Sequence, residues 1–136
     1  MMNTDFQIHP QLAQDSILLA DWPLSQLRLS LDANYPWFIL VPRRNNIKEI
    51  IDLSTEEQLQ LWQESACLSR WLQQYYQGDK LNIAALGNMV PQLHVHHIVR
   101  FKSDPAWPAP GWGKVAAIGY TEAELAKLLQ AVPAFG

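Results

Sequence analysis

Cysteine is almost absent from this chain, which has only one among its 136 residues. Cys67 therefore cannot form a disulfide bond within the chain, and no cysteine cluster is available to bind zinc. Disulfide bonds persist in oxidising compartments and are rare in reducing ones. The single cysteine leads us to expect a cytoplasmic protein.

Basic residues are also scarce. Ten lysines and arginines against 13 acidic residues give a formal net charge of −3. Broad binding of nucleic acid requires a basic surface that neutralises phosphates. We therefore expect neither DNA nor RNA as a partner, although a single nucleotide needs only a few local hydrogen-bond donors.

Long apolar runs are missing as well. No uninterrupted apolar stretch approaches the length of a membrane span, and residues 1–14 lack the basic start and apolar run of a signal peptide. We expect no membrane partner.

Apolar residues are nevertheless abundant in total. They make up 49% of the chain and include six tryptophans, which excludes a disordered protein. A chain of 136 residues is long enough to bury the core of one domain. We expect residues 1–136 to form a single domain, with its core at about 16–101. A segment rich in tryptophan and proline and a C-terminal helix then occupy 102–136.

The apolar pattern predicts a sheet with helices. Alternating residues or short apolar runs indicate strands at 16–20, 26–32, 37–41, 81–86 and 92–101. The first ten residues are expected to be a lead-in or a short turn. Short connections between the strands favour an α+β domain whose antiparallel sheet has about five strands.

Two helix starts are visible in the sequence. Ser54 and Glu57 have capping-box spacing, and the apolar stripe that follows predicts a long helix ending at residue 75 or 76. Thr121 and Glu124 have the same spacing and predict a short C-terminal helix over 122–130.

The predicted strand at 92–101 carries three histidines within four positions. Side chains alternate between the two faces of a strand, so His94 and His96 share a face with Gln92 while His97 faces the other way. Histidine titrates near neutral pH and serves as base, acid, nucleophile or metal ligand. The pair marks a candidate reaction site, and we expect His97 to be structural or to lie at a subunit contact.

The residues alone leave three interpretations of His94 and His96 open. They can be polar groups satisfied within the fold. They can be two ligands of a metal ion, although zinc sites generally need a third protein ligand and no Asp or Glu lies within the segment. They can also carry nucleophilic catalysis, in which one imidazole attacks and another group positions or protonates. Our expectation is the third, with no bound metal.

The histidine segment resembles the signature of the histidine triad (HIT) family of nucleotide hydrolases and transferases, in which three histidines alternate with apolar residues. The resemblance extends in order, with compatible spacing, from about residue 27 to residue 100. Trp107 and Trp112, with their neighbouring prolines, suggest a bacterial branch. The matching positions outside the histidines are Leu31, Asp32, Val41, Pro42, Arg43, Arg44, Asn82, Gly87, Asn88 and Val90.

This resemblance implies a nucleotide phosphohydrolase or phosphoramidase that acts at the α-phosphate. His94 would attack phosphorus and form a covalent nucleotidyl-histidine, which water later releases, while His96 would help the leaving group depart. The positions that match phosphate and ribose ligands of the family are Asn82, Gly87, Asn88 and, for the ribose, Asp32. An alternative role for Asp32 is that of a turn former. The resemblance also implies a homodimer and no required cofactor, although a divalent cation can accompany a polyphosphate substrate.

Two departures from the family pattern bear on activity. Gln92 stands where the first histidine of the triad would be, and its amide can still orient the nucleophile but cannot titrate. Asn45 and Asn46 follow the basic loop where many family members carry a histidine. Arg43 and Arg44 in that loop either clamp a polyphosphate or lie on the solvated surface. The departures motivate an alternative, a nucleotide-binding module that keeps the pocket and has lost turnover.

Overall fold

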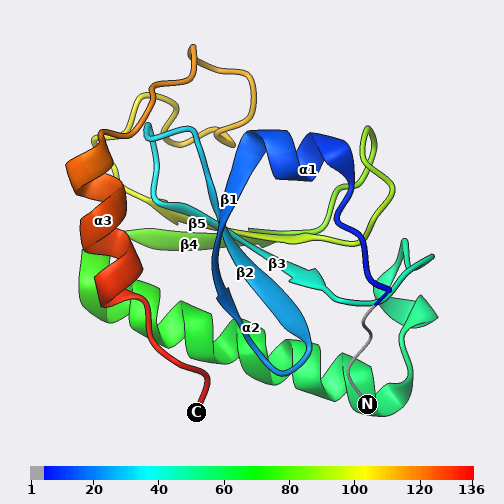
Figure 1. Ribbon diagram of the computed structural model, residues 1–136. Helices are drawn as coiled ribbons and strands as arrows, with labels where there is room; N and C mark the ends of the chain where they lie inside the picture. The colour runs from blue at the N-terminus through cyan, green and yellow to red at the C-terminus, as the bar shows by residue number, and fades with distance from the viewer. Residues whose placement is uncertain (1–4) are drawn as a thin grey trace.

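The computed structural model describes residues 5–136 and shows the expected α+β architecture (Figure 1). Its five-stranded antiparallel sheet has the order β1-β2-β3-β5-β4. The strands are β1 (Ser16–Asp21), β2 (Ser25–Ser30), β3 (Trp37–Pro42), β4 (Lys80–Ala84) and β5 (Val95–Arg100). The helices are α1 (Pro10–Asp15), α2 (Thr55–Tyr76) and α3 (Glu122–Ala131), with a short 3-10 turn, η1, at Ile50–Asp52. None of the helices within residues 5–136 is long and apolar enough to cross a membrane.

The sheet separates two apolar clusters. One lies between the sheet and α2, where Phe38 and Leu40 of β3 meet Leu68 and Leu72, all fully buried. The other lies on the opposite face, beneath α1, and its buried members are Leu12, Tyr35, Trp37, Ile39, Val41, Ile98 and Ala106. Because side chains alternate along a strand, β3 contributes to both clusters and is buried throughout. Its wholly apolar sequence follows from that central position.

The predicted starts of the two longer helices, α2 and α3, are confirmed. The Ser54 hydroxyl accepts a hydrogen bond from the Glu57 amide, and the Glu57 carboxylate accepts one from the Ser54 amide, which completes the capping box of α2. Thr121 and Glu124 do the same for α3. At its other end α2 stops at Gln77, which has left-handed backbone angles of φ 53° and ψ 47°.

Helix α1 was not predicted, because residues 1–10 were interpreted as a lead-in or short turn and 16–20 as the first element. A signal was present nonetheless. Pro10 occupies the first helical turn, where a proline costs no hydrogen bond, and His9 Nδ1 accepts from the Gln11 amide at 3.0 Å as the N-cap. His9-Pro10 is therefore a helix start.

The predicted strand over 92–101 is wrong in its first part, since β5 begins only at Val95. Strand β4 ends at Ala84, opposite His96, so the residues before His96 lose their partner on that side. The Leu93 amide instead donates to the Ile47 carbonyl, 2.9 Å away, in the loop after β3. His94 therefore precedes the strand and His96 lies within it.

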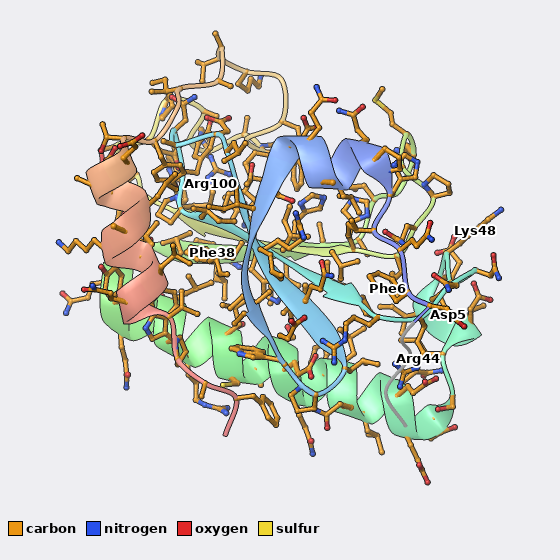
Figure 2. All side chains as sticks on the ribbon, in the orientation of Figure 1. Asp5, Phe6, Phe38, Arg44, Lys48 and Arg100 are labelled. Atoms are coloured by element: carbon orange, nitrogen blue, oxygen red, sulfur yellow. The ribbon has the colours of Figure 1, made fainter. Side chains whose placement is uncertain are left out.

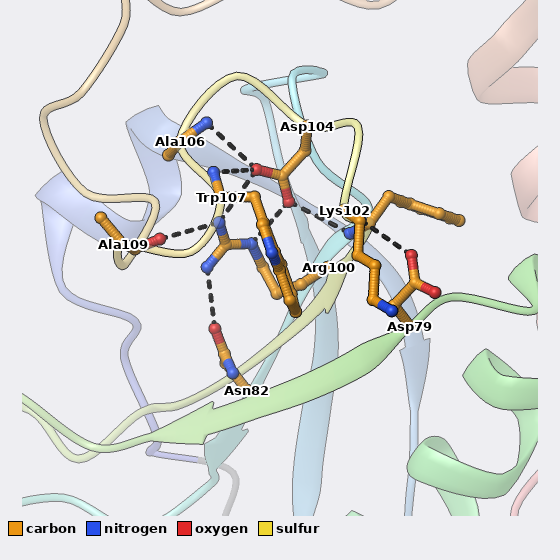
Figure 3. A network of polar contacts seen from close by, with 9 residues as sticks. Asp79, Asn82, Arg100, Lys102, Asp104, Ala106, Trp107 and Ala109 are labelled. Atoms are coloured by element: carbon orange, nitrogen blue, oxygen red, sulfur yellow. Dashed lines mark hydrogen bonds and ion pairs between the residues drawn. The ribbon is translucent and has the colours of Figure 1, made fainter.

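A buried ion pair fixes the segment rich in tryptophan and proline to the end of β5 (Figure 3). Arg100 contacts Asp104 through two nitrogens, at 2.8 and 2.9 Å, and both side chains are almost fully buried. Asp104 also accepts from the amides of Ala106 and Trp107, and Arg100 donates to the Ala109 carbonyl. These bonds set the path by which the chain reaches Trp112.

Candidate active site

A cavity of about 590 Å³ opens on the sheet face that α1 covers. Trp37, Ile39 and His96 line it from the sheet, and His94 lies just before β5. Around them stand α1, the end of β2, the loop at 86–90 and two residues of the C-terminal region, Trp112 and Ala117. The cavity thus collects segments from both ends of the chain around two histidines.

His94 and His96 lie side by side, with ring centroids 4.9 Å apart and an interplanar angle of 77°. Both are buried. His94 Nδ1 is 2.7 Å from the Gln92 carbonyl oxygen. A carbonyl oxygen can only accept, so Nδ1 carries the proton and the neutral ring keeps its lone pair on Nε2. That lone pair is the nucleophilic position of the ring.

His96 is held in the opposite tautomer by Trp37. The indole nitrogen of Trp37 donates to His96 Nδ1 at 2.9 Å. Because an indole N–H cannot accept, Nδ1 is unprotonated and the neutral ring carries its proton on Nε2. Burial, followed by the neighbouring His94, lowers the pKa of His96 to about 3. His96 is therefore a neutral hydrogen-bond donor in the physiological pH range.

The two rings are chemically complementary: one presents a lone pair at Nε2 and the other an N–H at Nε2. Such a pair can attack an electrophilic centre while donating to an oxygen or nitrogen bonded to it. Trp112 packs edge-on against the His96 ring, with centroids 5.2 Å apart, and against Trp37 at the same distance. The aromatic packing fixes the ring that the indole N–H orients.

His97 faces away from the cavity, as predicted, and its role is structural. It is fully buried against α2, where its Nε2 lies 2.7 Å from the Ser65 hydroxyl. Its Nδ1 lies 3.1 Å from the Val95 carbonyl. Burial lowers the pKa of His97 to about 4, which keeps the ring neutral.

Three of the four predicted phosphate and ribose ligands line the cavity: Gly87, Asn88 and Asp32. Asp32 also has the alternative role predicted for it, that of a turn former, because its Oδ1 accepts from the amide and side chain of Asn34. The same oxygen accepts from the Ile118 amide at 3.3 Å. Within residues 5–136, Asp32 Oδ2 has no hydrogen-bond partner and stays available to a ligand.

Asn82 and Gln92, both predicted at the site, have other partners. Asn82 Oδ1 accepts from Arg100 at 3.0 Å (Figure 3). The Gln92 side chain accepts from the His9 amide at 2.8 Å and donates to the Gln7 carbonyl at 3.0 Å. Neither residue belongs to the cavity lining among residues 5–136. Gln92 touches the site through its backbone carbonyl, which orients His94.

The lining described within residues 5–136 holds no lysine or arginine, and its charged members are Asp15 and Asp32. Arg43 pairs with Asp21, and Arg44 pairs with Glu57 on α2. Both arginine side chains are partly buried in these ion pairs, and neither lines the cavity. No group of three or more His, Cys, Asp or Glu side chains suited to a metal ion occurs in the described part of the chain.

Sequence reasoning missed three contributors to this site: α1, Trp112 and the tautomer-setting role of Trp37. The sequence places Trp37 only within the strand predicted at 37–41. Its contact with His96 depends on the β3–β5 register, in which Ile39 pairs with His96 and Trp37 with Ile98. Only the pairing of two strands far apart in the sequence reveals that contact, so no local pattern could have shown it.

Known proteins share both the sequence pattern and the fold. The sequence model of the HIT domain matches residues 11–103. A histidine triad protein from Bradyrhizobium japonicum is 47% identical over 93% of this chain and 94% of its own, with a TM-score of 0.91. One from Marinobacter aquaeolei is 48% identical over 93% and 92%, with a TM-score of 0.90, and one from Sinorhizobium meliloti is 39% identical over 94% and 95%, with a TM-score of 0.92. No curated protein matches the chain.

Proposed function

The chain belongs to the HIT domain family, and from that premise we propose that it is a nucleotide hydrolase acting at the α-phosphate through a covalent nucleotidyl-histidine on His94. The observation that carries the proposal is the complementary protonation of the two rings. His94 presents a lone pair at Nε2 because Gln92 O holds its Nδ1 proton. His96 presents an N–H at Nε2 because Trp37 occupies its Nδ1.

In the proposed first step, His94 Nε2 attacks the α-phosphorus and forms a P–N bond while the bond to the leaving group breaks. His96 Nε2–H donates a hydrogen bond to the leaving atom, and that atom takes its proton from solvent as its bond to phosphorus breaks. The positive charge that develops on the His94 ring is stabilised by its charge-assisted bond to the Gln92 carbonyl. Water then attacks phosphorus, breaks the P–N bond to His94 and releases the nucleoside monophosphate, and the proton lost by the water passes to solvent.

Backbone amides of the loop at 86–90 supply the proposed phosphate site. Gly87 has a φ of 66°, a left-handed conformation that bends this loop beside the histidines. Within the described residues, the amides of residues 87–89 have no hydrogen-bond partner, which leaves them available to phosphate oxygens. No cofactor is needed for either step.

The charge of the lining supports a substrate with little negative charge. Asp15 and Asp32 would repel a polyphosphate, and no lysine or arginine of residues 5–136 lines the cavity to offset that repulsion. Buried Arg28 donates to the hydroxyl and carbonyl of Ser16, a lining residue, and does not itself line the cavity. We therefore favour a phosphoramidate, whose α-phosphate carries one negative charge and whose leaving group is a neutral amine.

The test is hydrolysis of adenosine 5′-phosphoramidate by wild type, His94→Ala and His96→Ala. Removal of the nucleophile should lower kcat by at least about 10³-fold, and removal of the donor by about 10²-fold. Gln130→Ala, at an exposed position of α3, is the matched control and should hydrolyse like wild type. Binding of AMP without release of ammonia by the wild type would instead support the alternative, a binding module without turnover.

A homodimer is the second part of the proposal. Exposed apolar side chains on α2 support it, because Leu59 is 60% and Trp62 is 70% exposed in the single chain. Analytical ultracentrifugation should give twice the mass of the chain for wild type and the chain mass for Trp62→Glu. A monomeric wild type at concentrations used for assay contradicts this part and leaves the chemistry untouched.

A further inference from the structure

The segment at residues 5–9, here called the N-terminal strap, is held by two side-chain amides. The first belongs to Asn45, in the loop after β3. Its Oδ1 accepts from the Gln7 amide at 3.3 Å, and its Nδ2 donates to the Asp5 carbonyl at 3.0 Å. Figure 2 shows Asp5 and Phe6 next to the part of this loop that carries Arg44.

The second amide is that of Gln92. It continues the same arrangement one step along the strap, accepting from the His9 amide at 2.8 Å and donating to the Gln7 carbonyl at 3.0 Å. Both backbone groups of Gln7 are thus used, one by each amide. The two side chains replace the neighbouring strand that a β-ladder would supply, because they bond to alternate residues of an extended chain.

The intervening residues of the strap point into the fold. Phe6 and Ile8 are partly buried and pack against the apolar cluster that contains Trp37 and Ile39. The strap therefore presents its backbone polar groups to two amides and its apolar side chains to the face of the sheet that carries the cavity. Hydrogen bonds on one side and apolar packing on the other therefore fix the position of the strap.

The strap leads directly into α1, which forms one side of the cavity. His9 is the N-cap of α1, and Gln11, Leu12 and Asp15 of the helix line the cavity. An isolated helix of six residues is unstable in water, so α1 depends on tertiary contacts for its position. The contacts at its start are those of the strap.

We propose that Gln92 and Asn45 are positioning residues for ligand binding, which hold the strap and thereby α1 against the cavity. The inference rests on the proposed function for the identity of the ligand. Gln92 joins the two sides of the site, because its side chain holds the strap and its carbonyl orients His94. A carboxamide keeps its donor and its acceptor at every pH, whereas an imidazole loses its acceptor on protonation. This accounts for amides at two places where the family pattern favours histidine.

Hydrogen exchange tests the structural part without any ligand. In Gln92→Ala, the amides of residues 7–13 should exchange at least tenfold faster than in wild type, while those of β5 keep their rates. Gln92→Glu keeps an acceptor for the His9 amide but lacks the donor to Gln7, so its exchange should be intermediate. The Gln92→Ala/Asn45→Ala double variant should be fastest, and Gln130→Ala should match wild type. Unchanged exchange of residues 7–13 in the double variant overturns the proposal.

Binding and turnover test the functional part, with AMP and adenosine 5′-phosphoramidate as probes. Asn45 does not line the cavity that holds His94, so Asn45→Ala should raise the dissociation constant of AMP and KM about five- to tenfold and leave kcat within twofold. Equal binding in wild type and a variant with accelerated α1 exchange overturns the proposal. If exchange responds as expected but wild type does not bind AMP, the strap stands and the nucleotide site is the part that fails.

Discussion

At the scale of single residues, the tautomer of His96 is the feature most open to test. Trp37→Phe removes the indole N–H while keeping an aromatic ring, so Nδ1 loses its donor. The Nε2–H tautomer should then cease to dominate, which long-range ¹H–¹⁵N correlation spectra of the ring report directly. Loss of one buried hydrogen bond is expected to lower kcat by about tenfold, with little change in AMP binding.

Trp112→Phe is the matched control for that variant. Trp112 contacts the same ring through its edge, and within residues 5–136 its indole nitrogen donates to no other residue. The control should keep the Nε2–H tautomer. A Trp37→Phe spectrum identical to that of wild type would show that the indole does not set the protonation of His96.

The neutral buried histidines also predict how stability depends on pH. The pKa of His97 is lowered to about 4 and that of His96 to about 3, chiefly by burial. Between these values and about 6.5, the unfolded chain binds protons that the folded chain does not, so stability falls as pH falls. Each ring should cost about 2 kcal/mol between pH 7 and pH 5.

Urea unfolding at the two pH values measures this dependence. His97→Asn removes one of the two titrating groups, so its loss of unfolding free energy on acidification should be about 2 kcal/mol smaller than that of wild type. The ring resonances of His96 and His97 should not titrate between pH 8 and pH 5. An unaltered pH dependence in His97→Asn contradicts the assignment of a neutral buried ring.

At the scale of elements, the ion pair of Arg100 and Asp104 anchors the segment that carries Trp112. Asp104→Ala leaves the buried guanidinium unpaired and should destabilise the fold by about 3–5 kcal/mol. The bond to Arg100 lowers the pKa of Asp104 to about 2. The contribution of the ionised Asp104 carboxylate to the free energy of unfolding is therefore complete above about pH 4 and is lost as pH falls toward 2.

Urea unfolding of Asp104→Ala and of Arg100→Met/Asp104→Leu distinguishes the cost of an unpaired buried charge from the net contribution of the ion pair to the free energy of unfolding. The double variant removes both charges, so it should recover part of the stability that the single variant loses. Asp79→Ala, which removes only an exposed bond to the Lys102 amide, is the control and should cost about 1 kcal/mol or less. Equal stability of wild type and Asp104→Ala contradicts a buried anchoring pair.

Elements that local chemistry defines were predictable from the sequence. The capping box at Ser54 and Glu57 started α2 at the observed residue because both bonds are made within one turn. The start of β5 was misplaced, since nothing in residues 92–94 reveals that β4 ends at Ala84. His9-Pro10 was passed over because six residues are too few to establish helical periodicity.

At the scale of the whole molecule, the site was predictable where it depends on one segment and unpredictable where it depends on several. His94 and His96 meet because they are two residues apart, and His97 faces away for the same reason of alternation. Gln92 was placed at the site by its position in the motif, yet its side chain binds residues more than 80 positions earlier. The pairing of β4 with β5 likewise places the Asn82 side chain beside Arg100, which donates a hydrogen bond to it.

The cavity unites these segments because the sheet face opposite α2 is covered by both ends of the chain. Helix α1 and its strap come from one end, and Trp112 with Ala117 from the other. The identity of this chain as a HIT domain explains the sheet and the histidines. The cover formed by α1, the strap and Trp112 is where selectivity for a nucleotide derivative is expected to arise.

Trapping the covalent nucleotidyl-histidine on His94 during turnover tests the proposed chemistry. Wild type, His96→Ala and His94→Ala are mixed with adenosine 5′-phosphoramidate, quenched within milliseconds under alkaline conditions and mapped by mass spectrometry. Wild type should carry an acid-labile adenylyl group on His94 during turnover, and His94→Ala should carry none. Full hydrolysis of the substrate by wild type with no adduct on His94 at any time would contradict the proposed chemistry.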